Sequence, residues 1–432
     1  MVKVKTICRA REAYGQDTTQ DLPKMSKNTD SNLHPFAKAR EYTRAVNAAK
    51  LERIFAKPFV SALDGHTDSV MSLSRSDKHL SLFVSGSSNG ELKLWDLSVY
   101  KQVWGQDDAH TGFVTSLSFK HDHILSAGKD ASVKLWDLSS NRPKTQFNTN
   151  MPVSAVDFNW EVPTLFACSG TEGFQLWDVN RSQALFSTSW HPETLLTCKF
   201  NPAETPLVAT TGGDNSIVLY DTRSYSALHR TVLKRRCNAV AWNPREPMHF
   251  IAGCDDSNVY SFDMRKMEEI GHIFKDHLNA VMALSYNPTG REFASGGFDR
   301  TVRIFDIKDQ RSREVYHTRR MQQVSAVEFS GDGKFVISGS DDTNLRVWKA
   351  KSHVPLKTLL PREADAMQYR EKLKQKYQYH SEVRRLLKHR HLPRNLFKER
   401  KKQQIMTESE MRKERNRRDH TKPENIVTVS ER

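Results

Sequence analysis

The sequence contains few cysteines and no long apolar run. Five of its 432 residues are cysteine, and no two of them form a CxxC pair. Because Cys168, Cys198 and Cys254 lie in strand-like segments, we expect small buried thiols in a reducing compartment, rather than a metal site or a disulfide. No stretch approaches the ~18 consecutive apolar residues of a membrane span, and residues 1–17 have no apolar signal core. These absences predict a soluble, intracellular protein without a membrane partner.

Signatures of catalysis are also missing. The pairs Gly212-Gly213 and Gly296-Gly297 lie at turns between strand-like runs and are too short to form a phosphate-binding loop. No nucleophile is paired with a base outside a His/Ser/Asp set that recurs along the chain. The sequence therefore predicts a protein that is not an enzyme, with no cofactor and no small-molecule substrate.

An aromatic residue ends a short strand-like run seven times, at intervals of 41–43 residues. These residues are Trp95, Trp136, Trp177, Tyr220, Phe262, Phe305 and Trp348. The interval is typical of WD40 repeats, each of which forms a four-stranded blade of a β-propeller. We expect an all-β fold, a seven-bladed WD40 β-propeller over residues 57–360. Residues 59–63 would supply the outer strand of the last blade and close the ring.

A polar set recurs with the aromatic residue. In the second repeat it consists of His110, Ser126, Asp130 and Trp136, which in WD40 proteins form a buried hydrogen-bonded tetrad. The set resembles a hydrolase triad, but its recurrence in several repeats favours a structural role. The first repeat has Asn89 at the Asp position, so we expect a weaker network there. The fifth and seventh repeats have Arg235-Arg236 and Arg319-Arg320 in place of the histidine.

The net charge of +15 comes entirely from the two ends of the chain. Residues 1–56 contain 11 Lys/Arg and 6 Asp/Glu, and residues 361–432 contain 21 and 11, whereas residues 57–360 contain 34 of each. Helical spacing of apolar residues predicts a helix at about 37–55 in the N-terminal extension (1–56) and a basic, helical C-terminal domain (361–432). Basic segments beside a neutral ring indicate a polyanionic partner.

The basic residues of the C-terminal domain are densest between Arg384 and Arg394, where Glu382 is the only nearby acid. A helix would arrange them as a cationic ridge that can bind phosphates. We take the following as candidate RNA-binding residues: Arg384, Arg385, Lys388, His389, Arg390, His391, Arg394, Lys401, Lys402, Arg412 and Arg415. A solvated helix, a nuclear-import signal and purely protein contacts remain as alternatives. His389 and His391 have no further Cys or His nearby, so we expect no metal site.

Two consecutive repeats end in an aromatic-Asp-x-Arg sequence, with Asp221 and Arg223 in the fourth and Asp263 and Arg265 in the fifth. This four-residue box resembles the one with which some WD40 proteins dock on the adaptor of cullin-4 ubiquitin ligases. The resemblance implies a ligase-adaptor contact through these residues. A purely structural role for the two arginines is the alternative.

Several longer motifs resemble the Sof-like family of WD40 proteins. They are Leu33-His34-Pro35-Phe36, the run from Leu51 to Phe59, the run from Arg311 to Gln322, and His389-Arg390-His391-Leu392-Pro393. The resemblance implies a nuclear, nucleolar protein of the U3 small nucleolar ribonucleoprotein and the small-subunit processome. Its partners would be pre-rRNA and processome proteins, and its role the processing of pre-rRNA to 18S rRNA. For animal members the resemblance also implies an alternative, a substrate receptor of a cullin-4 RING E3 ubiquitin ligase.

Overall fold

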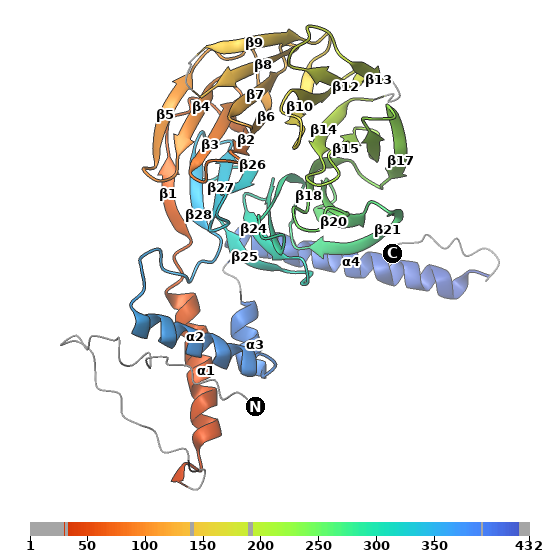
Figure 1. The fold of residues 1–432 in the computed structure, drawn as a ribbon. Helices are drawn as coiled ribbons and strands as arrows, with labels where there is room; N and C mark the ends of the chain where they lie inside the picture. The colour runs from red at the N-terminus through yellow and green to blue at the C-terminus, as the bar shows by residue number, and fades with distance from the viewer. Residues whose placement is uncertain (1–29, 31–32, 139–141, 189–192, 390–391, 423–432) are drawn as a thin grey trace, which may run out of the picture. The chain divides into compact units, whose positions relative to one another are not determined.

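The computed structural model describes residues 30, 33–138, 142–188, 193–389 and 392–422. Within them the chain forms seven four-stranded antiparallel sheets arranged as a ring, and four helices (Figure 1). Each sheet carries one aromatic residue of the repeat near the end of its third strand. The expected all-β, seven-bladed propeller is confirmed.

The strands follow the chain in order through the first six blades. Blade one contains β2 (Val70–Arg75), β3 (Leu82–Ser87), β4 (Leu92–Asp96) and β5 (Lys101–Gln106). Blade two contains β6 (Val114–Lys120), β7 (His123–Gly128), β8 (Ser132–Asp137) and β9 (Pro143–Asn148). Blade three contains β10 (Val153–Phe158), β11 (Leu165–Gly170), β12 (Gly173–Asp178) and β13 (Phe186–Thr188). Blade four contains β14 (Leu195–Phe200), β15 (Leu207–Gly212), β16 (Ser216–Asp221) and β17 (Ser226–Val232).

The remaining blades complete the ring. Blade five contains β18 (Cys237–Trp242), β19 (His249–Cys254), β20 (Asn258–Asp263) and β21 (Lys266–Lys275). Blade six contains β22 (Val281–Tyr286), β23 (Glu292–Gly297), β24 (Val302–Asp306) and β25 (Ser312–Tyr316). Blade seven contains β26 (Val324–Phe329), β27 (Phe335–Ser340), β28 (Leu345–Lys349) and, from the start of the propeller, β1 (Phe59–Leu63). The pairing of β1 with β28, with Leu63 opposite Leu345, confirms the predicted closure.

The core lies between neighbouring blades. Every residue of β15 is buried, whereas the outer strand β17 alternates between partly buried and exposed positions. Inner strands are covered on both faces and so read as runs of apolar and small residues, while outer strands meet water on one face. Trp104 of blade one packs against Trp136 of blade two, with 6.2 Å between ring centroids. Hydrophobic burial thus locks each blade to the next and makes the ring rigid.

The chain divides into two compact units. One joins the segment up to Leu51 with Leu359–Leu387, and the other comprises Glu52–Thr358 and Lys388–Arg432. The first contains most of α1 (Ala37–Ile54), α2 (Pro361–Lys376) and all but the last residue of α3 (Ser381–Lys388). The second contains the ring and α4 (Arg394–His420). The helices predicted at about 37–55 and in the basic C-terminal domain are therefore present.

Contacts within the first unit join the two ends of the chain. Ala45 and Val46 of α1 are buried with Leu373 of α2 and Val383 of α3. At the edge of this cluster Lys376 Nζ lies 2.8 Å from the Glu41 carboxylate. The sequence predicted both helical segments but not their packing together. Among the described helices, none combines the length and apolar composition that crossing a membrane requires.

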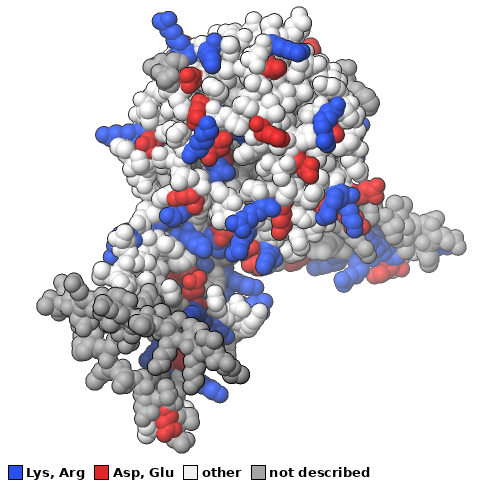
Figure 2. Space-filling model, viewed as in Figure 1, with Lys and Arg blue, Asp and Glu red and all other residues white. Residues whose placement is uncertain are grey.

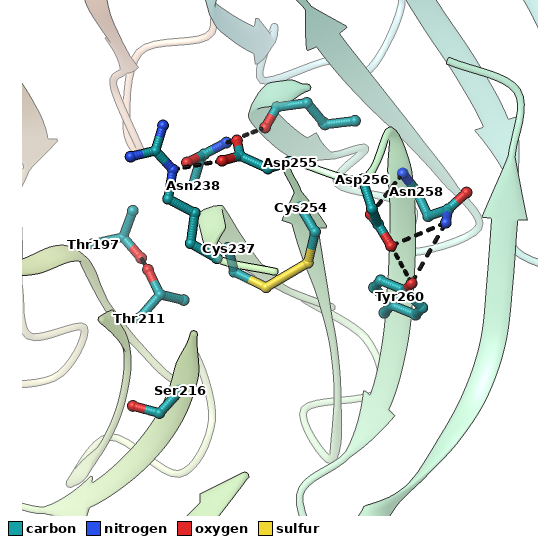
Figure 3. The surroundings of a disulfide bond; sticks show 12 residues. Thr197, Thr211, Ser216, Cys237, Asn238, Cys254, Asp255, Asp256, Asn258 and Tyr260 are labelled. Carbon is teal, nitrogen blue, oxygen red and sulfur yellow. Dashed lines mark hydrogen bonds and ion pairs between the residues drawn. A yellow bond between two sulfur atoms is a disulfide. The ribbon is translucent and has the colours of Figure 1, made fainter. Parts of the chain in front are cut away.

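The expectation of unpaired cysteines is wrong for one pair. Cys237 and Cys254 form a disulfide within blade five (Figure 3). The two residues are 17 apart in sequence, but β18 and β19 are antiparallel and place them directly opposite each other. Neither cysteine lies in a CxxC motif, so only the strand register reveals the pair. Cys168 and Cys198 are buried free thiols, as expected, while Cys8 lies outside the described residues.

Candidate interaction surfaces

The structure brings the four tetrad residues of blade two together. His110 Nδ1 lies 3.0 Å from Asp130 Oδ2, and His110 Nε2 lies 2.7 Å from Ser126 Oγ. Trp136 Nε1 donates to the same Ser126 oxygen at 2.8 Å. Burial lowers the pKa of His110, which keeps the imidazole neutral. Because Ser126 is fully buried and already engaged twice, its hydroxyl cannot reach a substrate, and the network holds the blade together.

Blade one contains a complete network despite Asn89, which corrects the expectation of a weaker one. Glu91 replaces the turn aspartate: its carboxylate lies 3.0 Å from His66 Nδ1 and also accepts a hydrogen bond from the Thr67 hydroxyl. His66 Nε2 lies 2.6 Å from Ser85 Oγ, to which Trp95 Nε1 donates at 2.7 Å. The signal in the sequence was an acid two residues after Asn89. Residues i and i+2 of an extended chain point to the same side, so this acid can reach the histidine that Asp contacts in other blades.

The two aromatic-Asp-x-Arg boxes occupy equivalent turns between the third and fourth strands of neighbouring blades. Asp221 and Asp263 each accept the backbone N–H of the following arginine, at 2.9 and 3.1 Å. Asp96 accepts the backbone N–H of Ser98 in the same way in blade one, so the aspartate is a general turn former. The arginines point outward, with side chains 73% exposed for Arg223 and 64% for Arg265. The exposed arginines, and not the aspartates, therefore distinguish these two turns from the equivalent turn of blade one.

The candidate residues of α3 lie opposite its apolar contacts. Val383 is fully buried and Leu386 and Leu387 are partly buried, whereas Arg384 and Arg385 are exposed. Lys388 at the end of the helix and the following His389 are also exposed. Arg390 and His391 lie outside the described residues. The described part of the ridge thus presents its cations to solvent.

The long helix α4 is anchored to the ring along one side. Arg400 Nη2 lies 3.1 Å from Asp276 Oδ1, and Gln403 Nε2 donates to the carbonyl oxygen of Leu278 at 2.7 Å. Asp276 and Leu278 belong to the loop that joins blade five to blade six. The sequence did not indicate Asp276 or Gln403 as contact residues, because no local sequence pattern links position 276 with positions 400–403.

The opposite side of α4 is basic. Arg394, Lys398, Lys401 and Arg412 follow at intervals of 4, 3 and 11 residues, which places them on one stripe of the helix, away from Arg400 and Gln403. Ile405 and Glu408 lie on the same stripe between Lys401 and Arg412. All four basic residues of the stripe are exposed, as are Lys402 beside the stripe and Arg415 on its flank. The stripe extends about 27 Å at 1.5 Å per residue. Since α4 has ten Lys/Arg against five Asp/Glu, most of its cations cannot be neutralised within the helix.

No group of three His, Cys, Asp or Glu side chains in the described part of the chain is placed to hold a metal ion. Charged residues of both signs are interspersed over the visible face of the ring (Figure 2), as its equal numbers of acids and bases suggest. A neutral ring with a helix whose solvent side is basic has the features of a scaffold, with its candidate contacts at the turns and along α4.

These features define the class: a seven-bladed WD40-repeat propeller with a basic helical extension. The model of the WD domain, G-beta repeat, matches residues 57–96 and 102–137, and that of the Nucleolar protein 10-like N-terminal domain matches 142–368. The Sof1-like domain model matches residues 350–432. The chain belongs to the family that contains protein SOF1 of Saccharomyces cerevisiae and the animal proteins called DDB1- and CUL4-associated factor 13.

Similarity to these relatives extends over the whole chain. The chain is 37% identical to SOF1, covering 96% of this chain and 91% of the yeast protein. It is 40% identical to the DDB1- and CUL4-associated factor 13 of Xenopus laevis and 38% identical to that of Homo sapiens. Both alignments cover 100% of this chain and 98% of the relative. The family resemblance inferred from the sequence motifs is confirmed.

Proposed function

We propose that this protein is a non-catalytic ribosome-biogenesis factor, a WD40 scaffold of the U3 small nucleolar ribonucleoprotein and small-subunit processome. Its ring would hold neighbouring processome proteins, and its basic C-terminal residues would contact pre-rRNA during processing to 18S rRNA in the nucleolus. The family supports this assignment, because the Sof1-like domain match covers the basic helices.

The observation that carries the proposal is the two-sided character of α4. Arg400 and Gln403 fix one side to the ring, and the other side presents Arg394, Lys398 and Lys401 to solvent. A basic helix that was merely solvated would not need one side fixed to the ring and the other side basic. A helix that fixes cations at regular spacing on a rigid scaffold reduces the entropic cost of binding a polyanion and favours contact with successive phosphates.

The test replaces Lys398, Lys401, Lys402 and Arg412 by Gln in cells depleted of the endogenous protein. Because glutamine keeps the helix but removes four charges, we expect less co-sedimentation with pre-ribosomes and an accumulation of unprocessed 18S precursors. A matched control replaces four exposed lysines of outer strands, Lys101, Lys144, Lys266 and Lys275, by Gln. Equal 18S maturation in both variants and in the wild type would reject the role proposed for α4.

A second function is supported by the two boxes. Arg223 and Arg265 are exposed at equivalent turns of adjacent blades, and the names of the animal relatives associate those proteins with DDB1 and CUL4. We propose that these arginines, positioned by Asp221 and Asp263, contact the cullin-4 ligase adaptor, with this protein as the substrate receptor. R223E/R265E should then abolish adaptor pull-down, whereas charge reversal at Lys101 and Lys144 should not. Unchanged pull-down by R223E/R265E would exclude the boxes as the docking site.

A further inference from the structure

One face of the ring carries two kinds of loop. Since each blade is a four-stranded antiparallel meander, the loop that enters a blade and the loop between its second and third strands emerge at the same end of the strands. Hydrogen bonds join these loops in individual blades, for example from Asp255 N to Arg236 O at 3.0 Å. We call this end of the ring the entry face. The two boxes lie in turns between third and fourth strands and therefore on the opposite face.

Charge on the entry face is separated between the blades. In blades one to four, the exposed acids among the described loop residues are Asp64, Asp68, Asp107, Asp108, Glu172 and Glu193, and the exposed base is Lys129. In blades five to seven, the exposed bases are Lys234, Arg235, Arg236, Arg300, Arg319 and Arg320, and the exposed acid is Asp341. We call the exposed acids of blades one to four the acidic arc and the exposed bases of blades five to seven the basic arc. The ring has equal numbers of acids and bases in total, but on this face they are separated.

The basic arc is not explained by the stability of the ring. In blade seven Trp348 Nε1 donates to Ser338 Oγ at 2.8 Å, and the Asp342 carboxylate is held by Arg346. The network of that blade therefore does not use Arg319 or Arg320. In blade five Arg236 pairs with Asp255 at 2.5 Å. No ion pair or side-chain hydrogen bond to another described residue holds Arg235, Arg300, Arg319 or Arg320.

Two further features favour RNA over an acidic protein segment. Phe298, in the loop of blade six between the two arginine pairs, is 42% exposed and offers a ring on which a base can stack. The anchor of α4, at Asp276 and Leu278, lies in the entry loop of the same blade. α4 is thus anchored at the blade that carries Phe298 and Arg300, which favours one polyanion that contacts both the ring and the helix.

We propose that the basic arc of blades five to seven is a second RNA-binding surface, formed by Arg235, Arg300, Arg319 and Arg320 with Phe298. It would bind the phosphates of a single-stranded RNA segment that continues along α4. Guanidinium groups can bind phosphate oxygens bidentately, while the stacked base is read without strong sequence preference. This inference rests on the proposed RNA role and extends it from the helix to the ring, with the acidic arc excluding RNA from blades one to four.

The experiment measures binding of the full-length chain to a fluorescent single-stranded uridine oligonucleotide over a range of salt concentrations. The variant R235Q/R319Q/R320Q should bind roughly tenfold more weakly at low salt, with a salt slope smaller by about 2, because three phosphate contacts are lost at about 0.7 each. Phe298→Ala should weaken binding without changing the slope. The matched control R181Q/R245Q/R291Q, which replaces three exposed arginines on the opposite face, should bind like the wild type.

The α4 variant with Lys398, Lys401, Lys402 and Arg412 replaced by Gln separates the two proposals. If it loses affinity while R235Q/R319Q/R320Q keeps the wild-type affinity and slope, the basic arc does not bind RNA and the proposed function stands. If neither variant loses affinity, the RNA contact of the proposed function fails as well. Circular dichroism of each variant confirms the fold, and all the substituted arginines and lysines are exposed.

Discussion

Arg400 of α4 and Asp276 of the ring form an ion pair that joins the C-terminal helix to the loop between blades five and six. Asp276 also accepts hydrogen bonds from the backbone N–H and hydroxyl of Ser312 and lies 3.7 Å from Arg303. A largely buried carboxylate is thus shared between the ring and the helix. This arrangement lets a helix with few apolar contacts keep a fixed side toward the propeller.

Removing the anchor should loosen α4 without unfolding the ring. Arg400→Ala combined with Gln403→Ala removes the ion pair and the hydrogen bond to Leu278 O, while Arg303 and Ser312 still satisfy Asp276. A partly exposed pair is worth about 1 kcal/mol or less, so the melting temperature of the ring should shift little. Hydrogen exchange should become faster across residues 394–420. Unchanged exchange there would show that other contacts hold the helix.

Breaking a tetrad should have a much larger effect. Ser126→Ala leaves Trp136 Nε1 and His110 Nε2 without their buried partner, which should cost roughly 2–4 kcal/mol in free energy of unfolding. Denaturant unfolding measures the change. Ser224→Ala, at an exposed turn position, is the control and should change stability by less than about 0.5 kcal/mol. Equal effects of the two substitutions would contradict a structural role for the network.

Much of this architecture follows from the sequence because local patterns determine it. The aromatic interval predicted the seven blades, and the spacing of apolar residues predicted α1, α2 and α3. Local patterns do not predict the contacts between residues that are distant in the sequence. These are the packing of α1 with α2 and α3, the ion pair of Asp276 with Arg400, and the disulfide of Cys237 with Cys254. These contacts depend on register and docking, which no local pattern of residue types encodes.

In blade one a different residue fills the role of the turn aspartate, so the prediction of a weak network there was wrong. Asn89 suggested a weak network in blade one, but Glu91, the residue before β4, places its carboxylate 3.0 Å from His66 Nδ1. A longer acidic side chain can start two residues away and still place its carboxylate at His66. Position-by-position comparison of the repeats therefore misses a network that the three-dimensional arrangement preserves.

Glu91 gives the stability of blade one a specific dependence on acid. Burial alone would raise its pKa, but hydrogen bonds from Thr67, His66 and Lys93 outweigh burial and lower the pKa to about 2. A carboxyl whose pKa is lower in the folded than in the unfolded chain stabilises the fold above the unfolded pKa, and that contribution disappears as pH falls. The loss should occur from about pH 4.5 down to about pH 2, and amount to roughly 3 kcal/mol.

Comparison of wild type with Glu91→Gln tests this dependence. The variant should be less stable at pH 7, and its melting temperature should fall less than that of the wild type between pH 5 and pH 3. Asp64→Asn, at an exposed position in the loop that enters the same blade, is the control, because it leaves the histidine network intact. If Glu91→Gln shows the same pH dependence as the wild type, Glu91 is not the ionised partner of His66.

The cysteine pair makes a chemical prediction. Alkylation of the unfolded, unreduced protein should modify Cys168 and Cys198, and peptide mapping should recover Cys237 and Cys254 in linked peptides. After reduction Cys237 and Cys254 should be modified as well, and stability should fall by about 3 kcal/mol, as expected for a loop of this length. Alkylation of Cys237 and Cys254 before reduction would show that the pair is not oxidised in the purified protein.

RNA crosslinking in cells, with sequencing of the bound RNA and mapping of the crosslinked peptides, tests the central claim most directly. The account predicts that pre-rRNA is the main crosslinked RNA and that the peptides come from α4 and from the entry loops of blades five to seven. Neutralising Lys398, Lys401, Lys402 and Arg412 should remove the α4 crosslinks. Absence of pre-rRNA, or crosslinks confined to blades one to four, would contradict it.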